Sequence, residues 1–107
     1  ACLELHTYSS LSVEFLEHYR GCMDAADRAM VYFSPHAIQL KRLPGITPEQ
    51  IKNAFDRNDL QVFTEPESLR QELLAISWKN KNLLMMSSGN FDGINMNELA
   101  DKICTEP

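Results

Sequence analysis

Four short runs of apolar side chains are spaced along the chain, and each run predicts a β-strand. They cover residues 1–5, 29–33, 60–63 and 82–86. Val31-Tyr32-Phe33 in the second run and Leu83-Leu84-Met85-Met86 in the fourth are nearly continuous, as in strands that are covered on both faces. The pattern therefore predicts strands buried inside the domain.

The longer segments between these runs carry apolar side chains at helical spacing. Ser12 is placed to cap a first helix, and Thr47-Pro48-Glu49-Gln50 has the capping pattern of a second. Thr64-Glu65-Pro66-Glu67 opens a third helix, and Asn95 or Asn97 caps the last. The side chains expected to face inward are Phe15, Leu16, Tyr19 and Met23; Ile51, Ala54 and Phe55; Leu69, Leu73, Leu74 and Ile76; and Leu99, Ala100 and Ile103.

Alternation of strand and helix along the whole chain predicts a single α/β domain over residues 1–107. Such a pattern forms a mainly parallel sheet with helices on both faces. The chain opens directly on an apolar run without a polar lead-in, which is unusual because terminal residues fray unless they are tied down. We therefore expect a domain cut from a longer protein.

Composition narrows the class of protein further. The net charge of −5 disfavours a nucleic-acid surface, which needs a basic face. The longest apolar runs are too short to span a bilayer. The three cysteines, Cys2, Cys22 and Cys104, share no metal-ligand spacing, which favours a reduced, cytoplasmic protein with buried thiols.

The polar loop Ser87–Gly93 is the strongest candidate for chemistry. Ligands of open parallel sheets bind beyond the carboxyl ends of the strands, and this loop follows the last predicted strand. Gly89 and Gly93 allow positive φ and close approach of a ligand to the backbone. The residue types fit both an anion site formed by backbone N–H groups and an ordinary capped turn.

Two further segments leave predicted strands at the same edge. His6-Thr7-Tyr8-Ser9-Ser10 follows the first strand, where His6 could contact an anionic ligand or take a proton; the alternative is that its hydroxyls satisfy loop backbone groups. Pro35-His36 follows the second strand, where a histidine is either structural or part of the ligand side. We expect Trp78 to be a packing residue, and a paired-carboxylate role for Asp24 and Asp27 has only weak support.

Much of the chain resembles the C-terminal domain of the Mur ligases. The stretches that carry the resemblance run from Gly21 through Ala25-Ala26-Asp27 to Ser34-Pro35-His36, and from Asn82 through the loop Ser87–Gly93. It extends from Glu4-Leu5-His6-Thr7 to the last helix, and the Ser-Gly-Asn-Phe-Asp-Gly loop is its most specific part. Within the family, the chain is most similar to the murein peptide ligase group.

The resemblance implies a Rossmann-like fold and a share in an ATP-dependent amide ligation. Mur ligases join an amino acid or peptide to a UDP-muramyl carboxylate, using ATP and Mg²⁺ through an acyl phosphate. For this group the partners are UDP-N-acetylmuramate and the acceptor peptide L-alanyl-γ-D-glutamyl-meso-diaminopimelate, in peptidoglycan recycling. The family's central domain carries a Gly-Lys-Thr/Ser ATP loop and most metal ligands. This sequence has no such loop, which fits a C-terminal domain that closes over the site and is inactive alone.

The resemblance also implies site residues, which we assign where positions of this sequence match the motifs of the family. His6 and Thr7 match the first-strand loop that faces the ATP-binding domain. Pro35 and His36 fall where diaminopimelate-adding ligases carry an Asp-Asn-Pro-Arg motif; that motif is absent here, so the tripeptide acceptor rests on overall likeness. No metal ligands are expected in this chain. The residues that match the family's substrate-contacting loop are Ser87, Ser88, Gly89, Asn90 and Phe91.

Two other functions fit the sequence. One is a non-catalytic Rossmann-like module that binds a nucleotide or a protein partner. The other, an independent one-domain enzyme, ranks third because the sequence contains no complete nucleophile–base or metal constellation.

Overall fold

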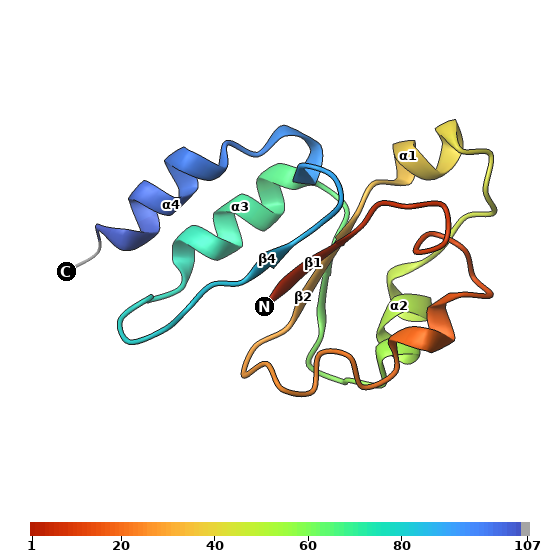
Figure 1. Cartoon of the computed structure of the whole chain (residues 1–107), viewed down its shortest axis with the longest axis horizontal. Coiled ribbons are helices and arrows are strands. Elements are labelled where there is room, and N and C mark those ends of the chain that lie inside the picture. Colours follow the sequence, from red (N-terminus) through yellow and green to blue (C-terminus); the bar gives the residue numbers. More distant parts are fainter. Residues whose placement is uncertain (106–107) are drawn as a thin grey trace.

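The computed structural model describes residues 1–105, which form a four-stranded, all-parallel sheet with helices on both faces (Figure 1). The strands are β1 (Cys2–Leu5), β2 (Met30–Phe33), β3 (Gln61–Phe63) and β4 (Met85–Met86), in the order β3-β2-β1-β4. The register pairs Cys2 with Met30 on one side and with Met85 on the other. The predicted α/β class is confirmed, and the arrangement is consistent with a Rossmann-like fold.

Helices divide between the two faces of the sheet. Helix α2 (Pro48–Phe55) and the 3₁₀ helix η1 (Leu16–Tyr19) pack on one face, over a core that contains Phe33 and Phe55. Helices α3 (Pro66–Ala75) and α4 (Met96–Cys104) cover the other face, over a core that contains Tyr32 (Figure 1). The two cores account for the buried runs in β1 and β2, whose neighbouring side chains point to opposite faces.

Strand β4 is shorter than predicted, since pairing covers only two residues of the run 82–86. It lies at the edge of the sheet, and β1 is its partner. Leu84 is 58% exposed and bonds to β1 through its carbonyl oxygen, which accepts from the Cys2 amide. The expectation that this whole run is covered on both faces was wrong: Leu84 is exposed, and both residues of β4 are only half-buried.

The segment predicted as the first helix forms turns and only the short helix η1. Ser12 does not cap it; its hydroxyl donates to the Glu14 carboxylate. Leu16 and Met23 are buried as predicted, but Phe15 is 38% exposed. Gly21 has a left-handed φ of 76°, which interrupts a helical path at that point.

The sequence predicted two of the three helices whose first turn is capped by a side chain. Thr47 forms a capping box with Gln50, and Asn95 accepts from the Glu98 amide at the start of α4. Helix α3 begins at Pro66 without a side-chain cap. Helix α1 (Pro35–Leu40), capped by Ser34, was not predicted.

A second side chain assigned to a buried helix face, after Phe15, is exposed. Ala100 lies on the outer side of α4, whereas Leu99 is buried and Ile103 is partly buried. Among the described residues, no helix is both long and apolar enough to cross a membrane.

The cysteines are unpaired, and only Cys2 is buried. The expectation of buried thiols was therefore wrong for Cys22 and Cys104. Burial raises the pKa of the Cys2 thiol to about 12, which keeps it protonated at neutral pH.

We predict two classes of thiol reactivity. With a disulfide reagent at pH 8, Cys22 and Cys104 should react quickly, because the thiolate is the nucleophile and both are exposed. Cys2 should react only when the chain unfolds, and adding denaturant should release it. Fast reaction of all the thiols in the native protein would contradict the buried position of Cys2.

Candidate functional site

The candidate site lies at the carboxyl ends of β1 and β4, which are neighbours in the sheet. After β1 the chain turns toward the face covered by η1 and α2, and after β4 it runs to α4 on the opposite face (Figure 1). The two loops therefore diverge at this edge. Such a switch point is where open α/β sheets bind ligands.

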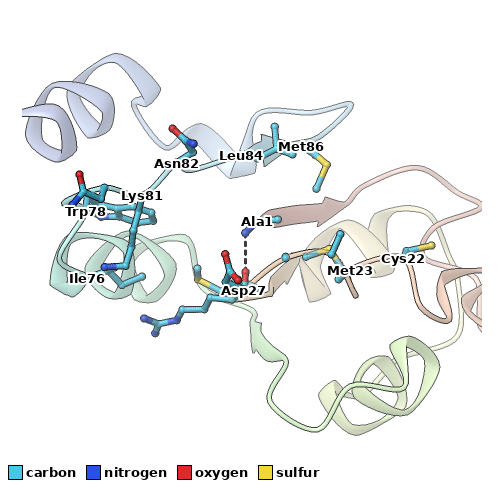
Figure 2. A pocket seen from close by; sticks show the side chains of 15 residues that line it. Ala1, Cys22, Met23, Asp27, Ile76, Trp78, Lys81, Asn82, Leu84 and Met86 are labelled. Carbon is cyan, nitrogen blue, oxygen red and sulfur yellow. Dashed lines mark hydrogen bonds between the residues drawn. The ribbon is translucent and has the colours of Figure 1, made fainter.

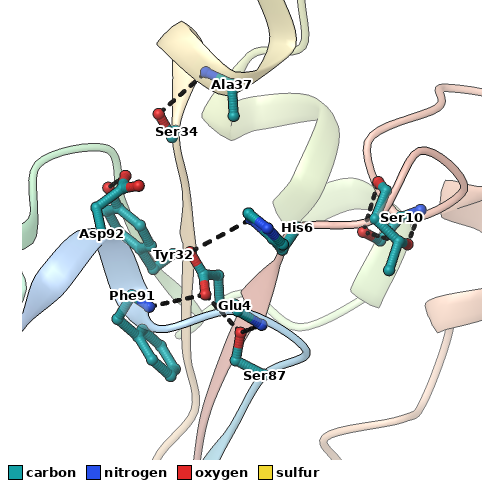
Figure 3. Close-up of polar contacts among 11 residues, drawn as sticks. Glu4, His6, Ser10, Tyr32, Ser34, Ala37, Ser87, Phe91 and Asp92 are labelled. Carbon is teal, nitrogen blue, oxygen red and sulfur yellow. Dashed lines mark hydrogen bonds and ion pairs between the residues drawn. The ribbon is translucent and has the colours of Figure 1, made fainter. Parts of the chain in front are cut away.

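Glu4, on β1, is the centre of the site. Its side chain is only 2% exposed. Oε1 accepts a hydrogen bond from the Ser87 hydroxyl and another from the Phe91 amide, at 2.9 Å for the amide. Figure 3 shows the carboxylate reaching from β1 into the loop that follows β4. One buried carboxylate thus joins the first strand to the predicted ligand loop.

Ser87 and Gly89 complete the turn around this carboxylate. The Ser87 hydroxyl oxygen accepts from the Gly89 amide at 2.7 Å. A Cβ on Gly89 would lie 3.0 Å from the Cδ2 and Cγ atoms of His6 and 3.1 Å from Glu4 Oε1. Glycine at this position therefore permits close approach of the loop to β1.

The end of the loop has an unusual backbone. Phe91 and Asp92 have left-handed φ values of 54° and 53°, followed by Gly93 at 87°. For each of the two non-glycine residues this conformation costs roughly 1–2 kcal/mol. Strain of this kind persists only where surrounding contacts hold it, and the bond from the Phe91 amide to Glu4 is one such contact.

Tyr32 supplies the other contact. Its ring is buried on β2, and its hydroxyl donates to the Asp92 carboxylate. Burial, together with the Asp92 carboxylate, raises the pKa of Tyr32. Its hydroxyl therefore stays protonated and remains a donor at neutral pH. The loop is tied to β1 at Phe91 and to β2 at Asp92.

Some of the predicted loop residues hold the loop in place, and others offer their side chains to a ligand. Ser87 and Gly89 form the contacts with Glu4, and Phe91 is 3% exposed, with its ring 6.2 Å from that of Tyr32. The Phe91 side chain is thus part of the core, and its amide holds the loop. Ser87, Ser88 and Asn90 are all exposed; because the Ser87 hydroxyl is bonded to Glu4, Ser88 and Asn90 are the loop side chains that a ligand would meet.

His6 lies beside Glu4 and the loop, and these residues together form the polar cluster of the site. Its Nδ1 lies 4.0 Å from Glu4 Oε2, and its side chain is 40% exposed. Figure 3 shows it on the opposite side of the carboxylate from Ser87 and the Phe91 amide. The structure therefore brings together His6 and the Ser87–Gly93 loop, as predicted from their positions after the carboxyl ends of parallel strands.

Thr7 and His36 are not part of the cluster. The Thr7 hydroxyl donates to Ser10 Oγ and accepts from the Ser10 amide, both at 3.0 Å. This is the local loop role that the sequence left open for these hydroxyls. His36 is exposed in the first turn of α1.

A cavity lies at the opposite, amino-terminal ends of the strands. It measures about 750 Å³ and is bounded by the turn before β2 and the segment before β4 (Figure 2). Trp78 lines this cavity and packs against the core beneath α3 and α4. Its Nε1 donates to the Leu73 carbonyl at 2.7 Å, and this arrangement is expected of a packing residue. Of the two aspartates considered as a carboxylate pair, Asp27 also lines the cavity and Asp24 is exposed outside it. We place the candidate site at Glu4, since the convergent polar groups lie there.

Metal binding by this chain alone has no support. Over residues 1–105, no group of three His, Cys, Asp or Glu side chains is placed to hold a metal ion. Oε1 of Glu4 already accepts from Ser87 and Phe91.

Sequence reasoning missed Glu4 as a site residue. The signal was present, because Glu4 is the one charged residue in an apolar run that predicts a buried strand. A buried charge must be hydrogen-bonded or paired, and its position beside His6 indicates where its partners lie.

Comparisons with known proteins add no relative. No protein-family model, curated protein or solved structure matches this chain.

Proposed function

We propose that this chain is the acceptor-binding, site-closing domain of an ATP-dependent amide ligase of the Mur type. In this proposal the whole enzyme joins L-alanyl-γ-D-glutamyl-meso-diaminopimelate to UDP-N-acetylmuramate in the cytoplasm. The observation that carries it is the convergence of His6 and the Ser87–Gly93 loop on Glu4, between β1 and β4. The resemblance of that loop to the substrate-contacting loop of Mur ligases supplies the ligand class.

The chemistry of the loop suits a peptide acceptor. Ser88 and Asn90 offer a hydroxyl and an amide, which bond to peptide groups and carboxylates as donors or acceptors. The loop beneath them is fixed by Glu4 and Tyr32. A site that is already ordered loses less conformational entropy on binding.

The rest of the reaction is assigned to a central domain of the same protein. That domain would hold ATP and Mg²⁺ and form the acyl phosphate. This chain would close over it, exclude water and align the acceptor amine. Such alignment and shielding are effective because an acyl phosphate is otherwise lost to hydrolysis.

A sequence observation separates this proposal from a non-catalytic binding module. In the full-length protein, a Gly-Lys-Thr/Ser loop about 200 residues before Ala1 would match a central domain of ordinary size. A different preceding domain would favour a module that binds a nucleotide or a protein partner.

Replacing Asn90 with alanine should weaken acceptor binding without unfolding the domain. Asn90 is exposed and makes no side-chain bond that caps the following 3₁₀ turn, η2 (Phe91–Gly93). A surface change of this kind alters the unfolding free energy by less than about 0.5 kcal/mol. We would titrate the wild-type chain with millimolar acceptor tripeptide and follow its amide resonances by NMR.

The wild-type titration should shift Ser87–Gly93 and His6, and the Asn90→Ala chain should need more tripeptide for the same shifts. Asn58→Ala is the matched control, because Asn58 is exposed in the turn after α2. A titration in which the Ser87–Gly93 and His6 resonances stay still would refute independent acceptor recognition by this domain.

A further inference from the structure

We infer that Glu4 and His6 form the proton-accepting pair of this site. His6 takes the proton that the acceptor amine must lose, and Glu4 is the positioning residue that holds the imidazole. The inference rests on the proposed function, because it concerns the transfer of an amine to an acyl phosphate.

Glu4 is built as a fixed carboxylate. Its side chain is 2% exposed, and Oε1 is held by the Ser87 hydroxyl and the Phe91 amide. Among the ion pairs of the described residues, the one that includes Glu4 is with His6. With Oε1 occupied, Oε2 is the oxygen that faces the imidazole. A buried carboxylate that no lysine or arginine pairs is expected to interact with that ring.

His6 is held between this carboxylate and the loop. Nδ1 lies 4.0 Å from Glu4 Oε2, which is longer than a hydrogen bond but close enough for one to form after a small movement of the ring. Such contacts are commonly long without substrate and tighten in the productive complex. The Gly89 backbone lies close to the ring, since a Cβ there would be 3.0 Å from Cδ2 and Cγ. The loop therefore borders the ring on one side, while its other side is open to solvent.

This arrangement sets the tautomer of His6. A carboxylate facing Nδ1 favours a proton on that nitrogen, which leaves the lone pair on Nε2 across the ring. The side chain is 40% exposed and lies close to Gly89 of the loop, at the carboxyl end of β1. An imidazole so placed is a proton acceptor, and the Glu4 carboxylate stabilises the imidazolium that forms.

The step balances as follows. His6 Nε2 takes one proton from the acceptor's ammonium group, which frees the nitrogen lone pair. The nitrogen attacks the acyl-phosphate carbonyl, the C–N bond forms, and the C–O bond to phosphate breaks. The phosphate leaves with the bonding electron pair and takes the second nitrogen proton as the amide forms. Nothing is oxidised or reduced.

Hydroxylamine, used in place of the tripeptide, distinguishes a residue that removes the proton from one that binds substrate or maintains the structure. It attacks acyl phosphates to give a hydroxamate, and it is largely unprotonated near neutral pH, so it needs no base. We would measure, in the full-length enzyme, amide formation with the tripeptide and hydroxamate formation with hydroxylamine. The variants are His6→Gln and Glu4→Gln, with His18→Gln, an exposed histidine on η1, as the control.

We expect His6→Gln to slow amide formation by about 10²-fold or more while hydroxamate formation is unchanged. Glu4→Gln keeps an oxygen for Ser87 and Phe91 but removes the charge, and it should slow amide formation by about 10–100-fold. The control should match wild type in both assays.

Equal loss of both products in His6→Gln would overturn the inference, because it would mark a binding or structural role. Undiminished amide formation in that variant would overturn it as well. A wild-type enzyme that forms neither product would instead overturn the proposed function, and the inference with it. The two failures are therefore distinguishable.

Discussion

Replacing Gly89 with alanine should disable the site while leaving the domain folded. The new Cβ would stand 3.0 Å from the His6 ring and 3.1 Å from Glu4 Oε1, closer than ordinary van der Waals contact. Glu4 is buried and hydrogen-bonded, whereas His6 is 40% exposed, so His6 is the group that moves. Displacement by about 1 Å at a reacting group costs on the order of 10²-fold in rate.

The stability cost of this change should be small, near 1 kcal/mol, because the side chain that yields is at the surface. Gly45→Ala is the matched control, since a Cβ there would meet nothing within 4 Å; it should be neutral or slightly stabilising. The measurements are the His6 ring resonances, the ligation rate and the denaturant midpoint. Unchanged His6 resonances and unchanged ligation in Gly89→Ala would show that the loop does not confine the imidazole.

Replacing Phe55 with alanine should produce the largest loss of stability. Phe55 is 1% exposed in the core beneath α2, and its ring stacks on Tyr19 with centroids 5.1 Å apart. Removing a buried phenylalanine costs about 3–5 kcal/mol. Because domains of this size are stable by about 5–15 kcal/mol, the change should leave the chain only marginally folded.

Leu40→Ala provides the comparison for this prediction. Leu40 is an apolar side chain of similar volume but is 70% exposed on α1, so its removal should change the unfolding free energy by less than about 0.5 kcal/mol. Urea unfolding of both variants checks the pair. A Phe55→Ala chain with nearly wild-type stability would contradict the packing of α2 on η1.

The buried parts of the fold were predictable from the sequence, because burial leaves continuous apolar runs. The runs that became β1, β2 and β3 were located to within a residue at each end. Capping side chains located α2 and α4 equally well, since Thr47 and Asn95 bond to the first turns. The same signals were misleading elsewhere: Ser12 and an apolar stripe predicted a helix where the chain forms turns around η1, and the apolar run 82–86 contains the exposed Leu84. Both outcomes depend on tertiary contacts.

The location of the candidate site could be predicted from the sequence, but the contacts that hold its residues could not. Alternation predicts a parallel sheet, so the carboxyl ends of its strands share one side; the order β3-β2-β1-β4, seen only in the structure, makes the ends that carry His6 and the Ser87–Gly93 loop neighbours. The role of Glu4 in the site could not be predicted from residue spacing, because its hydrogen bonds with Ser87 and Phe91 span more than 80 residues. Likewise, the left-handed Phe91 and Asp92 follow from contacts with Glu4 and Tyr32 rather than from their own preferences.

The most direct test of the central claim is ligation by the full-length protein that contains this chain. With ATP, Mg²⁺, UDP-N-acetylmuramate and the tripeptide, we predict ADP release and a UDP-muramyl tripeptide, both lost when residues 1–107 are removed. Omitting the tripeptide should abolish the amide product. Amide formation that persists without residues 1–107, or no amide formation by the intact protein, would contradict the account.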